Sequence, residues 1–333
     1  MKAFLQSKFL SDPAASGKLK TASQKELFEK VDPAVDGPDC DHDCASCTVK
    51  YPAKFDIDTS AKLYGKVDEW ATHVVVATGK TDWVRDIADE KGSVMRAIDK
   101  KATEPTNGKL KLSASNIPVP EEYHDAEEGH RPTKVLILPA FQWVDHVTPQ
   151  LADELITQFV SKSVTTTTLL NAQATTDEVA VPTTSSPLRA SPCQHAAVIL
   201  LCSQKTRDAR CGQSAPLLRK EFERHLRPLG LYRDIDDERP GGVGIYFISH
   251  VGGHKFSANV IIYRRKDFKW YERKEGEVNG SQDTGAAQGI WLARVRPEDC
   301  EGIVKHTVMK GKVIKPESQL RGGFDREKGL VSW

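Results

Sequence analysis

The segment His195-Ala-Ala-Val-Ile-Leu-Leu-Cys202 is an apolar run that ends in a cysteine. Such a run predicts a buried β-strand that presents Cys202 at its carboxyl end. After eight intervening residues comes Cys211, where a helix is expected to begin. Further along, the apolar run Gly244-Ile-Tyr-Phe-Ile-Ser249 leads into His250-Val-Gly-Gly-His254. Both the cysteine pair and the histidine pair are therefore expected where a strand gives way to a loop.

Two thiols and two imidazoles at strand ends are ligands for a soft or borderline metal, because thiolate and neutral imidazole both suit zinc, copper and iron. Zinc fingers space their cysteines about two to four residues apart, so that one tight turn places both sulfurs on one ion. Eight residues separate Cys202 from Cys211, and the two short Cys/His loops of a Rieske centre do not occur. The pattern favours a two-iron cluster with one pair on each iron, and a zinc ion is the alternative.

Each of these residues also has a simpler interpretation without a metal. Cys202 could be a small buried apolar side chain at the end of its strand. The two histidines could lie on one face of a helix, but Gly252 and Gly253 between them disfavour a helix. Glycines at these positions are better explained by backbone that passes close to a cofactor.

Three segments resemble the sucrase/ferredoxin-like family: Cys202-Ser-Gln-Lys-Thr-Arg-Asp-Ala-Arg-Cys211-Gly, Ser249-His250-Val-Gly-Gly-His254-Lys-Phe and Ile290-Trp-Leu-Ala-Arg-Val. The resemblance covers residues 40 to 315. Fungal members of this family are thioredoxin-like ferredoxins with a bis-histidinyl, non-Rieske 2Fe-2S cluster. The resemblance implies that Cys202 and Cys211 bind one iron, and that His250 and His254 bind the other.

The charge of this ligand set determines how readily the centre accepts an electron. Two thiolates and two neutral imidazoles cancel the two positive charges of an oxidised 2Fe-2S core, whereas four thiolates would leave the site negative. Replacing cysteine by histidine on one iron raises the potential by on the order of hundreds of millivolts in Rieske centres. Each imidazole binds through one nitrogen and can carry a proton on the other, so electron uptake is expected to be coupled to proton uptake.

The resemblance and the charge together predict a one-electron carrier in redox homeostasis or in tolerance of oxidative or xenobiotic stress. The sequence does not identify the electron donor or the acceptor. A carrier is favoured over a catalyst with its own substrate, because no pair of catalytic carboxylates supports the sucrase part of the family name. Four basic residues flank the ligands and could dock an acidic redox partner or form a solvated rim. They are Lys205, Arg207, Arg210 and Lys255.

A second cysteine cluster, Cys40-Asp-His-Asp-Cys44-Ala-Ser-Cys47, lies in an Asp-rich stretch. Its thiols could be a redox pair, part of a second metal site or plain surface thiols. One alternative function is therefore a thiol-disulfide oxidoreductase that uses Cys44 and Cys47, although such a pair should follow a strand and open a helix. Another alternative is a zinc-stabilised interaction module.

The length of 333 residues favours two domains. Strand and helix patterns alternate from residue 63 to 161, with a strand at Thr72–Ala77 and a helix from Asp82, its expected N-cap, to Lys100. Residues beyond 194 repeat this order, so we expect an α/β fold of two thioredoxin-like units, a possible duplication. The expected parts are a flexible leader (1–38), an N-terminal thioredoxin-like domain without cluster (39–161), a Thr/Ser/Pro-rich linker (162–193), a thioredoxin-like 2Fe-2S ferredoxin domain (194–315) and a C-terminal tail (316–333).

The composition, with 39% hydrophobic residues, predicts a soluble protein with ordinary cores. A net charge of +1 gives no reason to expect binding to nucleic acid or to an anionic membrane. No apolar run approaches the roughly 20 residues of a membrane span. Seven cysteines without a secretory signal favour reduced thiols in the cytoplasm. A mitochondrial location is the alternative, although presequences are Arg-rich and the first arginine here is Arg85.

The final segment, Gly329-Leu-Val-Ser-Trp333, follows a polar stretch and is expected to be a flexible arm. Val331-Ser-Trp333 resembles the C-terminal tripeptide by which the cytosolic iron-sulfur assembly targeting complex recognises client apoproteins. An aromatic ring beside a free carboxylate suits capture by a pocket on another protein. Trp333 is therefore the expected recognition residue, and packing of its ring on the body of the protein is the alternative.

Overall fold

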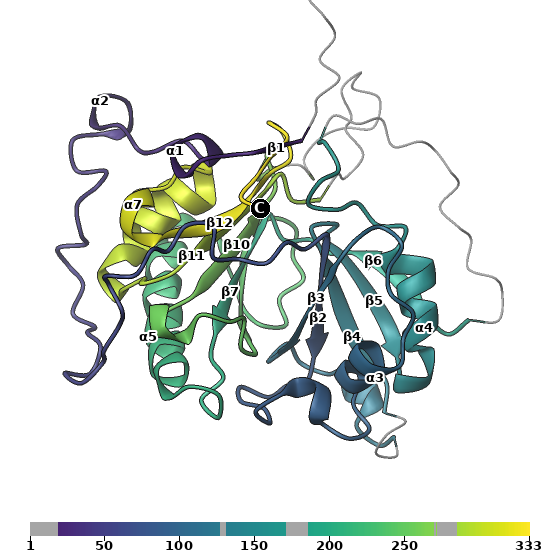
Figure 1. The fold of residues 1–333 in the computed structure, drawn as a ribbon. Coiled ribbons are helices and arrows are strands. Elements are labelled where there is room, and N and C mark those ends of the chain that lie inside the picture. The colour runs from purple at the N-terminus through teal and green to yellow at the C-terminus, as the bar shows by residue number, and fades with distance from the viewer. Residues whose placement is uncertain (1–18, 127–130, 171–185, 270, 272–284) are drawn as a thin grey trace, which may run out of the picture.

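The computed structural model describes residues 19–126, 131–170, 186–269, 271 and 285–333. Within these ranges the strands form one 13-stranded sheet in the order β1-β13-β12-β11-β10-β7-β9-β3-β2-β4-β5-β6, and β8 pairs with β9 off this path. Few helices accompany this large central sheet (Figure 1). The protein is therefore mixed α/β, as expected from the sequence.

The sheet consists of two halves with the same strand order and directions. The order is β3-β2-β4-β5-β6 in the N-terminal half and β9-β7-β10-β11-β12 in the C-terminal half. In each half the first two strands are parallel and the other neighbours are antiparallel. The halves join where Ser115 of β3 pairs with Ile248 of β9. The strands are β2 (Thr72–Ala77), β3 (Leu110–Ser115), β4 (Thr133–Leu138), β5 (Gln142–Val147) and β6 (Arg189–Pro192), then β7 (Ala197–Cys202), β9 (Val243–Ile248), β10 (Val260–Arg264), β11 (Gln288–Leu292) and β12 (Leu320–Asp325).

The remaining elements are short except for α5. The other strands are β1 (Lys20–Thr21), β8 (Tyr232–Arg233) and β13 (Leu330–Val331). The helices are α1 (Gln24–Leu27), α2 (Pro33–Asp36), α3 (Val94–Lys100), α4 (Ala152–Glu154, continued by Leu155–Val160), α5 (Ala209–Leu226), α6 (Cys300–Gly302, continued by Ile303–Val308) and α7 (Pro316–Gln319). Single 3-10 turns lie at Ile87–Asp89, Glu121–Tyr123, Pro149–Leu151, Arg227–Leu229, His254–Phe256 and Pro297–Asp299. No helix in the described ranges is both long and apolar enough to cross a bilayer.

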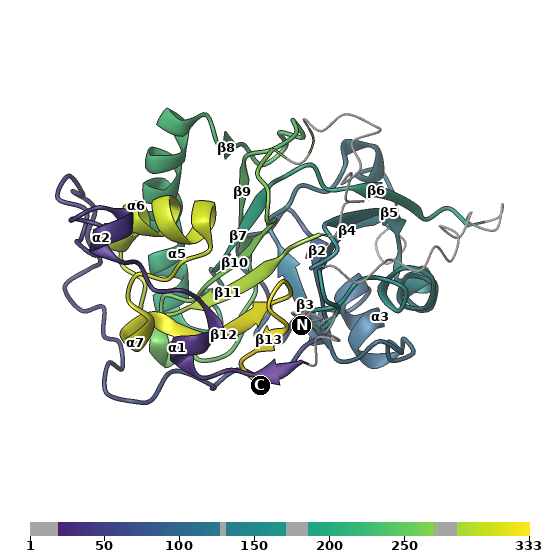
Figure 2. The same cartoon turned by 90° about the horizontal axis from the view of Figure 1, so that it is seen from above.

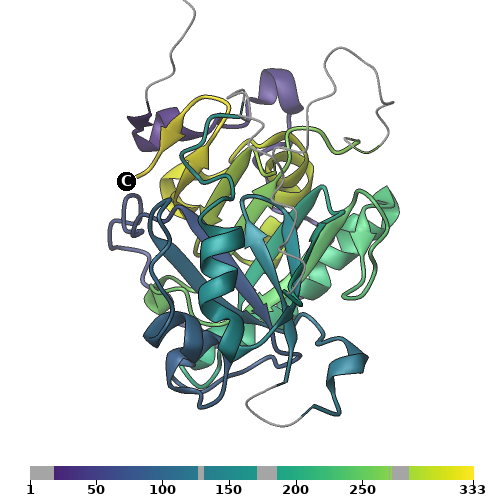
Figure 3. The ribbon, with the colours of Figure 1, turned by 90° about the vertical axis from the view of Figure 1, so that its right-hand side faces the viewer.

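The alternation of side chains along each central strand builds three apolar cores. In β2, Val74 packs with α3 and α4 in an outer core, while Val75 points the other way. In β7, Ile199 packs with α5 in a second outer core, while Val198 joins Val75 in the central one. The two half-sheets therefore share a core between them. Figure 2 shows α5 and α6 on the opposite side of the molecule from α3, and Figure 3 views the molecule from the α4 side.

The expected leader and linker contain ordered structure in their described parts. Residues 1–18 and 171–185 lie outside the described residues. Residues 19–38 are not a free leader, because β1 pairs with β13 and Leu27 and Phe28 are buried in the core of the C-terminal half. In the linker, β6 extends the sheet by pairing with β5. Composition indicated the lack of periodicity in these segments but not their contacts with distant strands.

Residues 316–333, expected to be a C-terminal tail that ends in a flexible arm at Gly329–Trp333, are part of the fold. These residues form α7, β12 and β13, and every residue of β12 is buried. Leu320 packs in the core around α5, and Phe324 packs in the central core. Glycine permits close backbone contact, because a Cβ on Gly323 would lie 2.0 Å from the carbonyl oxygen of Gly289. The Gly-Gly pair in this strand therefore marks close packing and not a loop.

The helix expected from Asp82 to Lys100 is much shorter in the structure. Ser93 caps α3 by accepting a hydrogen bond from the Arg96 backbone N–H at 3.0 Å. Asp82 caps no helix of its own half, and its carboxylate accepts bonds from Thr206 of the C-terminal half, at 2.7 Å from Oγ1. The acidic residue thus serves a tertiary contact between the two halves.

Candidate metal centre

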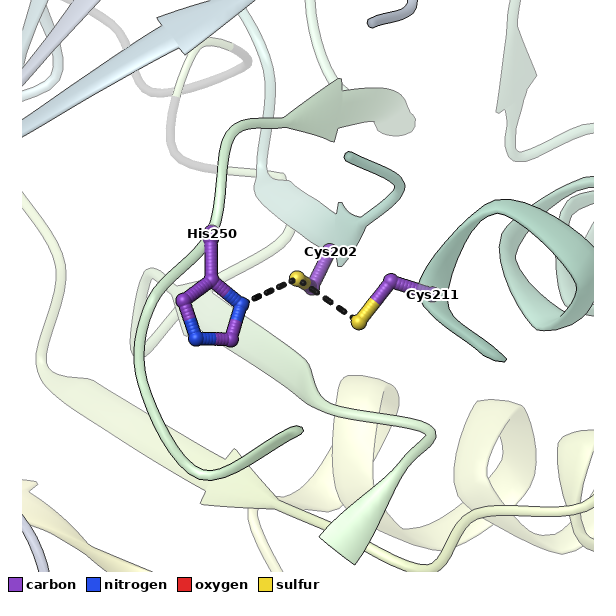
Figure 4. A group of neighbouring side chains, drawn as sticks. All are labelled: Cys202, Cys211 and His250. Atoms are coloured by element: carbon purple, nitrogen blue, oxygen red, sulfur yellow. Dashed lines mark hydrogen bonds between the residues drawn. The ribbon is translucent and has the colours of Figure 1, made fainter. Parts of the chain in front are cut away.

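The cysteine pair lies at the carboxyl end of β7 and the start of α5. Asp208 caps α5 by accepting a hydrogen bond from the Arg210 backbone N–H at 2.9 Å, which fixes Cys211 in the first turn. Cys202 is the last residue of β7, and its Sγ lies 3.4 Å from that of Cys211 (Figure 4). Metal–sulfur bonds of about 2.3 Å at a tetrahedral ion place two sulfurs roughly 3.8 Å apart. The two sulfurs therefore have nearly the separation of two ligands on one metal.

His250 completes a group of three ligand atoms that all lie within 4.8 Å of one another. It follows β9, and its Nδ1 lies 3.8 Å from Cys202 Sγ. Its backbone N–H donates to Gln204 Oε1 at 2.8 Å, which ties the histidine loop to the cysteine loop. The fourth expected ligand, His254, is outside this group, although its ring centre is 5.3 Å from that of His250.

The thiols and the imidazoles differ in their exposure to solvent. Cys202 and Cys211 are 2% and 0% exposed, whereas His250 is half-buried and His254 is exposed. Because the Cys202 thiol donates to the Cys211 sulfur, the pKa of Cys211 is lowered to about 5 and that of Cys202 is raised. Cys211 is thus the first of the pair to become a thiolate, the form that binds metals.

Gly253 of the histidine loop leaves room for an arginine behind it. Gly253 has a φ of +68°, and a Cβ at this position would lie 2.8 Å from the guanidinium nitrogens of Arg321. Arg321 Nη1 donates to the Gly252 carbonyl at 3.1 Å and to Asn259 Oδ1 at 2.7 Å. Arg321 was not among the residues predicted for the site, because it lies in β12, in the segment expected to be a tail. The Gly-Gly pair between the histidines was the available signal for a close neighbour.

The N-terminal half contributes a supporting loop to the site. Gln204 is 1% exposed, and its Nε2 donates to the Val84 carbonyl at 2.6 Å while its Oε1 holds His250. Ser203 Oγ donates to the Thr81 carbonyl at 2.9 Å. Gln204 was also missed, since an amide between Cys202 and Cys211 carries no signal for a contact in another half of the molecule.

The basic residues around the site are partly neutralised within the protein. Arg210 forms an ion pair with Asp208 at 2.8 Å, and Lys255 forms one with Asp58 at 3.3 Å. Arg207 donates to the Arg85 carbonyl, and Lys205 is exposed. The rim that faces solvent is therefore less basic than the sequence suggests.

The second cysteine cluster lies against the C-terminal half, which differs from its expected place in the N-terminal domain. Cys44 Sγ is 3.9 Å from Nε2 of His225 in α5, and Arg224 Nη2 donates to the same sulfur at 3.4 Å. Cys47 Sγ donates to the Val49 carbonyl at 3.4 Å, and Cys40 is buried in the core around α5. All seven cysteines have free thiols. None of these three side chains belongs to the group around Cys202.

Trp333 packs on the protein in the described structure. Its ring centre lies 4.6 Å from that of Trp70, and its backbone carbonyl accepts a hydrogen bond from Thr21 Oγ1 at 2.7 Å. The residue is half-buried and packs against the central core. The alternative expected for Trp333, packing of its ring on the body of the protein, is therefore what the structure shows.

Comparisons with known proteins agree with the motifs at this site. A family model described as sucrase/ferredoxin-like matches residues 63–322. "Actin patches distal protein 1" of Saccharomyces cerevisiae is 32% identical over 311 residues, which are 88% of this chain and 87% of that protein. "Altered inheritance of mitochondria protein 32" of Kluyveromyces lactis is 23% identical over 273 residues, 77% of each chain. The protein of the same name from Clavispora lusitaniae is 35% identical over 121 residues, 36% of this chain and 33% of that protein. No solved structure matches the chain significantly.

Proposed function

The chain belongs to the sucrase/ferredoxin-like family, and from its site we propose that it binds a 2Fe-2S cluster and carries single electrons. Cys202 and Cys211 would hold one iron, and His250 and His254 would hold the other. The observation that carries the proposal is the convergence of two sulfurs, 3.4 Å apart, with His250 Nδ1 3.8 Å from Cys202 Sγ.

The donor set fits a cluster of two irons better than one zinc ion. Sulfur and imidazole nitrogen suit both metals. A single ion draws all its ligand atoms within about 4 Å of one another, because its bonds are only about 2.0–2.3 Å long. His254 lies outside the group of three close ligand atoms, on a neighbouring turn of the same loop. His254 would hold a second iron together with His250, while Cys202 and Cys211 would hold the first.

The cysteines and the histidines of the site would have different roles in such a carrier. When bound, the cluster takes up and releases one electron. The buried thiolates keep water from the sulfur side, while the histidine side faces solvent, where a redox partner can approach. His250 presents Nδ1 to the cysteines, so its Nε2 can hold a proton. Electron uptake is in this way coupled to a proton at the accessible edge of the site.

The matching strand order of the two halves supports a duplicated thioredoxin-like unit. Each half has two parallel strands, with a helix between them, followed by antiparallel strands. Cys202 ends β7 in the C-terminal half, while the corresponding strand β2 ends in Ala77. On this proposal the second unit alone kept the ligands, and the first unit supports the site through Gln204 and Ser203.

We further propose a cytoplasmic role, in which the cytosolic iron-sulfur assembly targeting complex recognises Trp333 and redox partners meet the histidine side. Trp333 is half-buried at the surface of the protein, which is compatible with this recognition. Redox homeostasis, or tolerance of oxidative or xenobiotic stress, is the process that a soluble one-electron carrier would serve.

Iron and acid-labile sulfide analysis, with EPR of the reduced protein, tests the proposal. The purified protein should contain iron and sulfide in about equal amounts and give a signal typical of a reduced 2Fe-2S cluster. Cys202→Ser and Cys211→Ser should lose most of both. Cys47→Ser removes a thiol outside the ligand group and is the matched control, with unchanged content. Full iron and sulfide content in either ligand variant would exclude this assignment.

A further inference from the structure

A second group of ligand atoms lies away from the candidate cluster, at Cys44, His225 and Glu301. These atoms come from three separate parts of the chain, the loop after α2, the last turns of α5 and helix α6, and all lie within 4.8 Å of one another. Cys44 is 8% exposed, and the side chains of His225 and Glu301 are 12% and 30% exposed. A thiol, an imidazole and a carboxylate in one sheltered place are the three ligand types of protein-bound zinc.

Backbone contacts hold this group in place before any metal binds. The Cys44 N–H donates to the Glu298 carbonyl at 3.0 Å, which fixes the loop on the turn that leads into α6. His225 Nε2 points at the sulfur at 3.9 Å. Zinc bonds of about 2.0–2.3 Å place neighbouring ligand atoms roughly 3.3–3.8 Å apart. The three side chains therefore need to move together by no more than about 1–1.5 Å, which rotamer adjustments can provide.

We propose that Cys44, His225 and Glu301 bind a zinc ion at a site separate from the iron-sulfur ligands. A thiolate and a carboxylate supply two negative charges, which balance the charge of Zn²⁺, and imidazole suits the ion as a neutral ligand. Cys47 follows Cys44 at the C-x(2)-C spacing of structural zinc sites. Cys47 lines the same surface pocket as Cys44, although its sulfur lies outside the group of three ligand atoms. A change of its side-chain rotamer would be needed to bring it to the fourth position of a tetrahedral ion.

The cationic side chains beside Cys44 and Glu301 are compatible with zinc binding. Arg224 donates to the Cys44 sulfur at 3.4 Å, but it also forms an ion pair with Glu221 at 2.7 Å. Zinc would take the place of Arg224 on the sulfur and leave that ion pair intact. Lys305 pairs with Glu301 at the surface, where such a pair contributes at most about 1 kcal/mol and is readily exchanged for a metal.

The zinc ion would anchor a long segment that lacks regular structure. Residues 37–71, between α2 and β2, contain no helix or strand, and all of them are described. A connection of this length in a compact protein usually has a function or a specific anchor. His225 lies near the end of α5, the helix whose first turn contains Cys211. The site would thus hold the segment against the helix that carries a cluster ligand.

Metal analysis of the full-length protein tests the zinc site. After incubation with a small excess of Zn²⁺ and gel filtration, the iron-loaded protein should retain about one zinc per chain. Cys44→Ser and His225→Gln should weaken zinc binding at least tenfold and keep the iron. Glu301→Gln, which preserves shape, should also weaken it about tenfold. His42→Gln removes an exposed imidazole of the same segment and is the control that keeps both metals.

Two further measurements separate this site from the cluster and from a folding defect. Cys202→Ser should lose iron while its Cys44-dependent zinc remains, so the two proposals fail independently. A chelator should speed proteolysis within residues 37–71 of the wild type, whereas Glu301→Gln should be cleaved at the fast rate with or without chelator. Zinc retention that is equal in wild type and Cys44→Ser, or a wild type that retains none, would overturn the proposal.

Discussion

The four candidate ligands differ in their exposure to solvent, and this difference determines what each can contribute to the proposed cluster site. Cys202 and Cys211 are buried, with one sulfur donating to the other, so they provide a dry and negatively charged anchor. His254 is exposed and His250 half-buried, so they form the edge that protons and partners can reach. In the proposed cluster, the histidines would therefore have the larger influence on the pH dependence of the potential, and the cysteines would form the part of the site that is shielded from water.

Replacing His254 by Cys should lower the midpoint potential of the cluster and preserve its binding. The added thiolate brings a negative charge, which makes electron uptake harder, by on the order of a hundred millivolts or more. Protein-film voltammetry of the purified variant measures the shift. His254→Ala should instead lose or destabilise the cluster, because it removes a ligand without replacement. An unchanged potential in the cysteine variant would show that this position does not bind iron.

His195 gives the protein a dependence of stability on pH that is separate from the cluster. Burial lowers the pKa of this imidazole from 6.5 to about 4, while Nε2 lies 2.9 Å from the Tyr246 hydroxyl. Below about pH 6.5 His195 binds a proton in the unfolded chain but stays neutral in the folded protein. The free energy of unfolding therefore falls as pH falls. The slope between those two pKa values approaches about 1.4 kcal/mol per pH unit for this one group.

Urea unfolding of wild type and His195→Gln at several pH values between 7.5 and 5 tests this expectation. The glutamine variant should be less stable at pH 7.5 but should lose less stability on acidification. The difference between the two slopes removes the contribution of the cluster, which both proteins share. Parallel slopes would contradict the assignment of the proton to His195.

Among the elements, β7 and α5 were predictable and β12 was not. An unbroken apolar run ending at Cys202 has few interpretations other than a buried strand, and the helix expected to begin at Cys211 is α5, which starts at Ala209. In contrast, β12 reads Leu-Arg-Gly-Gly-Phe-Asp, and its two glycines and two charges obscure the strand pattern. Its arginine and aspartate are buried because they find partners on other elements. Hydrogen-bond partners that lie far away in the sequence cannot be predicted from the local pattern of polar and apolar residues.

Strand β12 also brings a positive charge to the candidate cluster through Arg321. Replacing Arg321 by Met should lower the midpoint potential, because a cation near the site favours the reduced state. A unit charge several ångströms away, at an effective dielectric constant of about 20, contributes roughly 1–2 kcal/mol, or tens of millivolts. Both Met and Lys variants should be less stable, since each loses the bonds to Gly252 and Asn259.

Arg321→Lys is the matched control for this charge effect. It keeps the cation while losing the forked hydrogen bonds, so its potential should stay near that of the wild type. Voltammetry and thermal unfolding of the two variants separate the two contributions. Equal potentials in the Met and Lys variants would show that Arg321 acts only by holding the histidine loop.

At the scale of the whole molecule, the sequence could indicate which candidate ligands lie at strand ends, but not the way in which distant segments assemble around them. The structure brings Cys202, Cys211 and His250 together, because the ends of neighbouring strands lie at one edge of the sheet. The crossing of residues 39–66 onto the C-terminal half leaves no periodic signal, since it is fixed by isolated bonds, such as Arg294 to the Asp58 carbonyl at 2.8 Å. Residues 39–66 were expected to belong to the N-terminal domain, but they pack on the C-terminal half.

Trp333 has a packing role in the structure and a proposed role in the delivery of the cluster. It contacts Trp70 of the N-terminal half, and its carbonyl accepts a bond from Thr21 of β1. The residue is half-buried, so capture by a partner would require the ring to leave its contact with Trp70. We predict that deleting Trp333 lowers iron content in cells, while the purified variant still accepts a chemically reconstituted cluster.

Thr21→Val is the control for the packing role of this segment, because it removes the hydrogen bond to Trp333 and keeps the tripeptide intact. It should lower the melting temperature slightly, since one exposed hydrogen bond contributes about 1 kcal/mol, and leave the iron content in cells unchanged. Iron loading in cells, sulfide analysis after reconstitution and melting temperature are compared for both variants. If the deletion variant fails to accept a cluster in vitro, Trp333 is needed for packing. If it is loaded normally in cells, the residue has no part in targeting, because recognition of a terminal aromatic ring cannot survive removal of that ring.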